Sequence, residues 1–153
     1  MSDLFIAVKS TLDRFMADQV AALQAQFPGI QFAEVDDQVQ VADQLATEAP
    51  ALIYSVSNPS PAPRFPLFSL DFAVGAKTVQ DKANYVMADL VSHLLTLFQP
   101  GYRMEVRDYS GTSGVAPLVA TLMIVSVAPD YQRFDRMAGV RLFGVTARGC
   151  EVV

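Results

Sequence analysis

Residues 117–127, PLVATLMIVSV, are apolar on both faces of the β-strand that they predict. Successive side chains of a strand point to opposite faces of a sheet, so this strand needs a cover on each face. The two alternating sets are Leu118, Ala120, Leu122 and Ile124, and Val119, Met123, Val125 and Val127. Helices can cover one face, and a second subunit is one way to cover the other. The sequence therefore predicts a sheet with helices packed on one side.

Two amphipathic helices are predicted, because apolar residues recur at intervals of three and four in residues 4–27 and 79–98. Ser2 is a suitable N-cap for the first helix. Thr78 followed by Asp81 has the spacing of a capping box and predicts the start of the second helix. Each apolar stripe is followed by a Pro-Gly pair, which is a helix-stop signal.

The remaining apolar segments predict strands. In LFSLDFAV, residues 67–74, apolar and polar side chains alternate, as in a strand with one buried face. The predicted strands are residues 51–56, 67–74, 102–109, 116–127 and 138–148, with shorter candidates at 30–35 and 38–41. The expected fold class is α+β, a mainly antiparallel mixed sheet with both helices on one face and with long projecting hairpin loops.

The stretch NPSPAPRFP, residues 58–66, holds four prolines and separates two predicted strands. The residues before it are too few to form an independent core, so we expect one domain, residues 1–153, with this stretch at the tip of a long hairpin. Prolines favour extended backbone and remove hydrogen-bond donors, so the tip should project. Arg64 and Phe65 then either form a partner contact, or Phe65 folds back onto its own domain.

A second candidate contact is APDYQRFDRMAG, residues 128–139, which is predicted to be a long hairpin loop. Tyr131, Phe134 and Met137 alternate there with Arg133, Asp135 and Arg136. Aromatic residues, methionine and arginine are enriched at protein interfaces. The candidate interface residues of this loop are Tyr131, Arg133, Phe134 and Arg136. An ordinary surface loop of this length is the alternative interpretation.

Charge is distributed unevenly along the chain. The formal net charge is −5, and no basic residue occurs between Arg14 and Arg64. This balance argues against a surface that grips phosphates, which needs clustered Lys and Arg. The acidic half is interpreted either as a solvated face or as a surface that avoids nucleic acid. No apolar run approaches the roughly 20 residues of a membrane helix, and the acidic N-terminus predicts no signal peptide.

No catalytic constellation is found in the sequence. FAVGAKT, residues 72–78, stands between a predicted strand and helix but lacks the spacing of a phosphate-binding loop, so Gly75 is interpreted as a turn. The single histidine, His93, lies among leucines of the second predicted helix. The single cysteine, Cys150, has no metal or redox spacing and fits a reducing compartment. We expect no enzymatic activity, no cofactor and no metal.

The order of these elements resembles the tail terminator, or tail completion, proteins of long-tailed bacteriophages. The likeness covers nearly the whole chain and is carried by the order of elements, because that family has no active-site signature. Its three pieces are LFIAVKSTLDRFMADQVAAL, the strand pair and helix within PALIYSV, FPLFSLDFAV and DKANYVMADLVSHLLTLF, and the closing strands APLVATLMIVSV and AGVRLFGVTA. The proline stretch and the ending RGCEVV do not fit the family pattern.

The resemblance implies a structural protein of the virion, located at the head-proximal end of the tail and in the host cytoplasm during assembly. It implies a homo-oligomeric ring, commonly of six subunits, that caps the tail tube and stops its polymerisation. The implied partners are the tail tube protein and the neck or head-completion proteins, with no membrane. DNA passes through the ring without specific binding, so an acidic bore would let it slide. The candidate bore residues are Glu34, Asp36, Asp37 and Asp43.

Two other functions remain open from the sequence. A neck or head-completion protein would also form a ring, bound on the portal side. A small cytosolic ligand-binding α/β module would need convergent polar groups in a pocket between the sheet and the helices. The candidate residues for such a pocket are Tyr54, Tyr85, Asp89 and His93.

Overall fold

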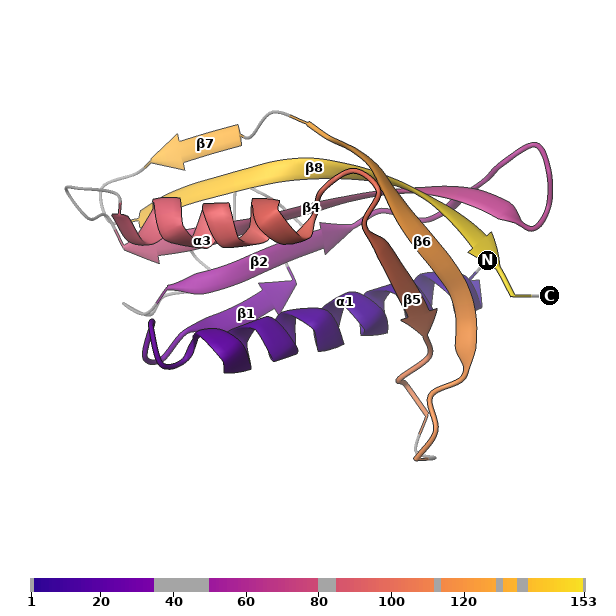
Figure 1. The fold of residues 1–153 in the computed structure, drawn as a ribbon, viewed down its shortest axis with the longest axis horizontal. Helices are drawn as coiled ribbons and strands as arrows, with labels where there is room; N and C mark the ends of the chain where they lie inside the picture. The colour runs from indigo at the N-terminus through magenta and orange to yellow at the C-terminus, as the bar shows by residue number, and fades with distance from the viewer. Residues whose placement is uncertain are drawn as a thin grey trace.

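Two helices and eight strands make up the part of the chain that the computed structural model describes, residues 2–34, 50–79, 85–111, 114–128, 131–134 and 138–152 (Figure 1). The helices are α1 (Ser2–Leu23) and α3 (Tyr85–Leu97). The strands are β1 (Gln31–Glu34), β2 (Ala51–Val56), β3 (Ser60–Pro61), β4 (Leu67–Val79), β5 (Arg103–Arg107), β6 (Leu118–Val127), β7 (Tyr131–Phe134) and β8 (Ala138–Glu151). Neither helix is long and apolar enough to cross a membrane.

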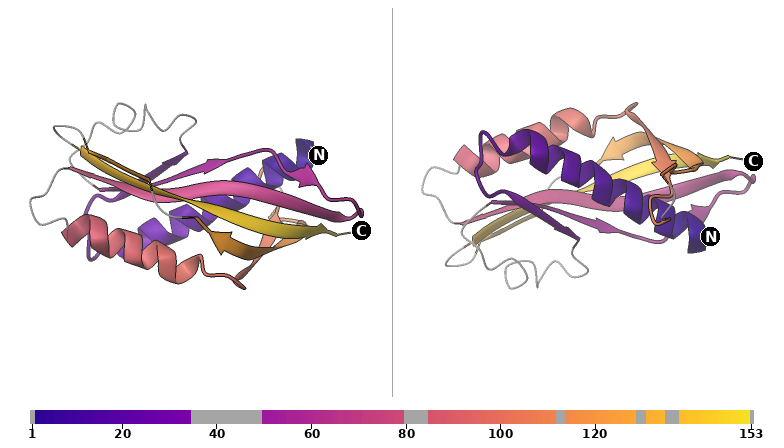
Figure 2. Two further views of the ribbon diagram at one scale, coloured as in Figure 1. Left: turned by 90° about the horizontal axis from the view of Figure 1, so that it is seen from above. Right: turned by 90° about the horizontal axis from the view of Figure 1, so that it is seen from below.

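The described strands form one mixed sheet in the order β1-β2-β4-β8-β6-β5, with β3 added to β4 and β7 added to β8. Only β1 and β2 are parallel, and the other pairs are antiparallel. The long pair of β4 and β8 is in register from Leu67 opposite Cys150 to Val79 opposite Ala138. Both helices lie on one side of this sheet (Figure 2). The predicted α+β class and the placement of both helices on one face are confirmed.

The main core lies between the helices and the sheet. On α1, buried apolar residues recur every four positions at Leu4, Val8, Leu12 and Met16, which aligns them on one face of the helix. The Phe98 ring, just after α3, connects the layers. Its centroid lies 5.2 Å from that of Phe15, 5.7 Å from that of Phe72 and 6.5 Å from that of Tyr102.

α1 ends at Leu23, four residues before the end of its predicted apolar stripe. The side-chain amide of Gln24 closes the turn that follows, donating to the Ile30 carbonyl (3.0 Å) and accepting from the Gly29 N–H (3.2 Å). Gly29 has φ 81°, a left-handed conformation that suits glycine. Phe27 still packs against the core, which explains why its position follows the helical pattern.

The predicted helix start at Thr78 is wrong. β4 continues through Val79, where Thr78 pairs with Gly139 of β8. Pairing with a distant strand overrides the local capping signal. Gly75 is likewise not a turn but lies inside β4, where an added Cβ would be 1.9 Å from the Arg141 carbonyl oxygen. Gly75 therefore permits a close approach of two backbones.

The proline stretch forms the tip of a hairpin, as predicted. β2 and β4 on its two sides pair antiparallel, from Ala51 opposite Lys77 to Val56 opposite Phe72. Within the stretch, β3 pairs with Ser69 and Phe68 of β4. The strands on both sides of the prolines therefore belong to one sheet.

The segment predicted as a long loop, residues 128–139, contains a strand instead. β7 pairs with β8, with Tyr131 opposite Leu142 and Phe134 opposite Gly139. Tyr131 and Phe134 are three positions apart and do not repeat at the strand period of two, so the local sequence favours a loop, and pairing with the distant β8 makes this segment a strand.

Candidate functional site

The side chains on the two faces of β6 differ in exposure. Leu122 and Ile124 are buried under the helices, whereas Met123 and Val125 are 39% and 38% exposed. The prediction that helices cover one face is confirmed. Of the second predicted apolar set, Met123 and Val125 are uncovered in the single chain, whereas Val119 and Val127 are partly buried against the main core.

We term the helix-covered surface of the sheet the closed face. The open face is the opposite surface at Leu67, Arg103, Thr121, Met123, Arg148 and Cys150.

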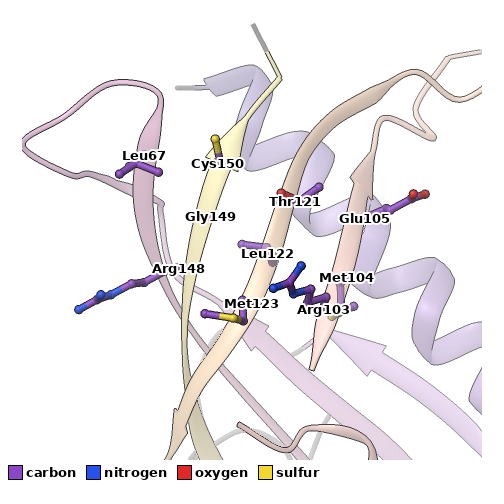
Figure 3. A pocket seen from close by; sticks show the side chains of 10 residues that line it. All are labelled: Leu67, Arg103, Met104, Glu105, Thr121, Leu122, Met123, Arg148, Gly149 and Cys150. Atoms are coloured by element: carbon purple, nitrogen blue, oxygen red, sulfur yellow. The ribbon is translucent and has the colours of Figure 1, made fainter. Parts of the chain in front are cut away.

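The open face is built by four strands in register. Arg103 of β5 lies opposite Met123 of β6, which lies opposite Arg148 of β8. One row further, Thr121 lies opposite Cys150, which lies opposite Leu67 of β4. These residues line a hollow of about 480 Å³ on the curled sheet (Figure 3). The sheet thus presents an apolar centre between two arginines.

The open face carries two arginines and one acid without ion pairs. The acid is Asp71 of β4, on the same strand face as Leu67, which is exposed and accepts a hydrogen bond from the Thr146 hydroxyl at 3.0 Å.

Glu105 is neutralised by Arg107, whose Nη2 lies 2.9 Å from its Oε2. Arg103 and Arg148 have no ion-pair or hydrogen-bond partner for their side chains within the described residues. Each guanidinium is therefore available to an external carboxylate, which it can bind through two parallel hydrogen bonds.

The proline stretch, residues 58–66, adjoins the open face at Leu67. Phe65 at its tip is 76% exposed, so the alternative in which Phe65 folds back onto its own domain is wrong. A smaller hollow of about 310 Å³ lies beside it, lined in part by Pro61, Leu67 and Glu151. Arg64 is exposed, and its side chain has no partner within the described residues. A role of Arg64 and Phe65 in partner binding stays a prediction.

The second predicted interface segment, residues 128–139, does not lie beside the open-face residues. Tyr131, Arg133 and Phe134 belong to β7, which pairs with residues 139–142 of β8. The open face uses residues 148–150 of the same strand, roughly 20 Å further along at about 3.3 Å per residue. Arg136 lies outside the described residues. The two candidate interface segments are therefore not brought together on one patch.

The predicted acidic bore is described only at Glu34. Its Oε1 lies 2.8 Å from Nζ of Lys9, so this carboxylate is tied to α1. Asp36, Asp37 and Asp43 lie outside the described residues. The acidic bore stays a prediction. The negative charge of Glu34, its one described residue, is neutralised by Lys9.

The residues proposed for a ligand pocket do not converge. The Tyr54 hydroxyl is buried and donates to Oδ1 of Asp13 at 2.9 Å, while Nε2 of His93 is 2.8 Å from Oε1 of Gln19. Burial, aided by the hydrogen bond to Asp13, raises the pKa of Tyr54. Asp89 is exposed on α3, and the Tyr85 side chain lies outside the described residues. Tyr54 thus joins β2 to α1, whereas half-buried His93 joins α3 to a different position on α1.

The sequence did not single out the contact that holds α1 against the sheet edge. The Thr11 hydroxyl accepts from the Arg107 N–H and donates to the Arg107 carbonyl, both at 3.0 Å. Ser10 Oγ also donates to this carbonyl, at 3.2 Å. These bonds satisfy backbone groups at the end of edge strand β5, which would otherwise be open to another strand. The sequence feature that could have predicted this contact is the polar pair Ser10 and Thr11 beside the apolar face of the first helix.

The arginines of the open face were also missed. The sequence signal was the alternation in RMEVR, residues 103–107, and TARGC, residues 146–150. There the charged residues lie on one strand face and apolar or small residues lie on the other.

Among the described residues, no group of three or more His, Cys, Asp or Glu could hold a metal ion. No family model matches this sequence, and a search of curated proteins finds no similar one.

Proposed function

We propose that this protein is a structural subunit of a long-tailed phage, a tail terminator that forms a ring on the end of the tail tube. The ring would stop tube polymerisation and provide the surface for joining the head, with the tube protein and neck proteins as partners. The protein would carry out no catalysis and would use no cofactor.

The observation that carries this proposal is the uncovered apolar face of β6. Exposed apolar side chains gathered on a small domain mark an interaction site, and Met123 and Leu67 line one hollow of the open face. Leu118 and Val125, nearer the two ends of β6, are exposed as well. A ring subunit needs a surface that is buried only on assembly. The exposed Phe65 arm gives a second surface, suited to a tube or neck protein.

Two further features support a structural role. The order of elements agrees with the resemblance described above, with a long first helix, a hairpin, a second helix and a closing strand pair. The Tyr54 hydrogen bond joins the sheet to α1 and the His93 hydrogen bond joins the two helices, which favours a structural role for both.

Light scattering on the purified protein tests the ring directly. Chains of 16.6 kDa should assemble into particles of about 100 kDa, corresponding to a closed ring of about six copies. Addition of the protein to polymerising tube protein should then shorten the tubes, with electron micrographs showing a cap at one end. Unchanged tube lengths at saturating protein would contradict the proposal, and binding to filled heads alone would identify a neck protein instead.

A further inference from the structure

One end of the sheet carries an exposed aromatic ring beside an apolar hollow. The ring is that of Phe65 in the proline stretch, and its residue is 76% exposed. The stretch projects at the end of the sheet near the C-terminus (Figure 2). The hollow of about 310 Å³ is lined by Pro61, Ala62, Phe65, Leu67, Phe68 and Glu151. A projecting ring and a recess therefore lie next to each other on one surface.

Backbone hydrogen bonds hold this surface in shape. The Leu67 N–H donates to the Arg64 carbonyl at 2.8 Å, and the Ala62 N–H donates to the Leu67 carbonyl at 3.0 Å. The Glu151 N–H donates to the Pro66 carbonyl at 2.9 Å, which ties the stretch to the end of β8. A contact built on a fixed turn loses less conformational entropy on binding than one built on a loop that must first be ordered.

Two unpaired charges of opposite sign belong to this surface. Arg64 is the one charged residue of the proline stretch, and it is exposed without a partner in the described part of the chain. Glu151 is the one charged residue among those that line the hollow, and its carboxylate has no partner there either. The next charged residue of β8 is Arg148, which strand alternation places on the other face, and that of β4 is Asp71, roughly 13 Å beyond Leu67. The recess is therefore acidic, and the residue next to the projecting ring is basic.

We propose that the proline stretches of two copies of this chain pair about a two-fold axis. Phe65 of each copy enters the hollow of the other, which brings Arg64 beside the partner's Glu151. A two-fold contact needs a self-complementary surface, and this one offers ring and recess, cation and anion, side by side. Each ring would remove about 150–250 Å² from water, so both rings together fall below the roughly 1,200–2,000 Å² of stable interfaces. The expected dimer is therefore weak and reversible.

The inference goes beyond the proposed function and does not rest on it. Pairing about a two-fold axis closes at two copies, so it cannot build a ring of six. In the free protein it would cover the surface that we assign to a tube or neck protein. If rings form through the open face, the same contact would join two rings and double their mass.

Two single charge reversals test the contact by sedimentation over a concentration series. Arg64→Glu alone and Glu151→Arg alone should each associate at least about tenfold more weakly than the natural protein, because both contacts then oppose like charges. An equimolar mixture of the two variants should recover association, since both contacts of a mixed pair again oppose unlike charges. Pairing of Arg64 with Glu151 inside one chain would give no recovery, because each variant chain carries two like charges.

A matched pair of truncations tests the ring. Phe65→Ala should also associate at least about tenfold more weakly. The control is Val115→Ala, because Val115 is 77% exposed and does not line the hollow. The control should associate like the natural protein, and thermal unfolding scans check that every variant folds.

Three results would overturn the inference. They are a natural protein with no two-copy step up to about 1 mM, a mixture that fails to recover, and equal effects of Phe65→Ala and Val115→Ala. Tube-length measurements separate these results from the proposed function. Tube capping without the two-copy step would refute the pairing alone, and the two-copy step without tube capping would refute the terminator role alone.

Discussion

Leu122 and Met123 are consecutive residues of β6 with similar apolar side chains, yet Leu122 is 2% exposed and Met123 is 39% exposed. Leu122 lies on the closed face, within the core formed by both helices. Met123 lies on the open face between two unpaired arginines. The comparison teaches that apolar neighbours in one strand contribute differently, because the closed side stabilises the fold and the open side stays exposed in the single chain.

The difference between the faces also appears in their polar groups. On the closed side, Tyr54 and Thr11 are buried and satisfied by hydrogen bonds to Asp13 and Arg107. On the open side, Arg103 and Arg148 stay hydrated and unpaired. A buried polar group without a partner would be costly, whereas an exposed one costs little until a partner displaces its water.

The largest expected difference comes from truncating the two neighbours on β6. Leu122→Ala should lower the free energy of unfolding by about 2–5 kcal/mol, because it removes buried methyl groups and leaves a cavity. Met123→Ala should change it by no more than about 0.5 kcal/mol at concentrations where the chain is monomeric. Urea unfolding measures both. Equal losses would show that the open face is covered within one chain.

A smaller effect is expected from the two glycines of β8 that face opposite sides of the sheet. An added Cβ at Gly149 would lie 2.1 Å from the Phe68 ring on the closed face, so Gly149→Ala should destabilise by about 1–3 kcal/mol. The matched control is Gly144→Ala, where the nearest atom would be the Ala128 Cβ at 3.6 Å. The control should stay within about 0.5 kcal/mol of the natural protein in thermal or urea unfolding. A neutral Gly149→Ala would mean that Phe68 can leave its position freely.

The smallest effect concerns the polar link between the closed face and α1. Tyr54→Phe removes the hydrogen bond to Asp13 and should cost about 0.5–1.5 kcal/mol near neutral pH. Asp13→Asn keeps an acceptor oxygen and should cost less. Urea unfolding compares the three proteins.

The pH dependence gives this link a second readout. The pKa of Tyr54 is raised in the folded state, and its ordinary value is 10.0. Its contribution to stability is therefore complete below about pH 10 and falls at higher pH, because the unfolded chain loses this proton first. The natural protein should lose more stability than Tyr54→Phe between pH 8 and 11. The same alkaline loss in both proteins would show that Tyr54 is not protected by burial.

Part of this architecture was accessible from the sequence. The apolar stripes predicted α1 and the later part of the second helix, and β2 was predicted with its observed bounds. The two apolar faces of β6 predicted that helices alone leave one face to be covered, and the proline stretch predicted a hairpin tip. These features follow from periodicity and local backbone chemistry, which neighbouring residues encode directly.

Other features depend on residues that are distant in sequence. Thr78 extends a strand because Gly139 offers a pairing partner, and Gly75 is confined by the Arg141 carbonyl. The same reason explains the candidate site. Arg103, Met123 and Arg148 become one row only through the registers of β5, β6 and β8. The sequence by itself determined α1, the later part of α3 and the main course of the long strands, but not β7 or the end of β4, and it determined that one strand is apolar on both sides. The tertiary structure decided which side the helices cover and which charges meet on the other, because strand register is set by the packing and hydrogen bonding of the whole sheet.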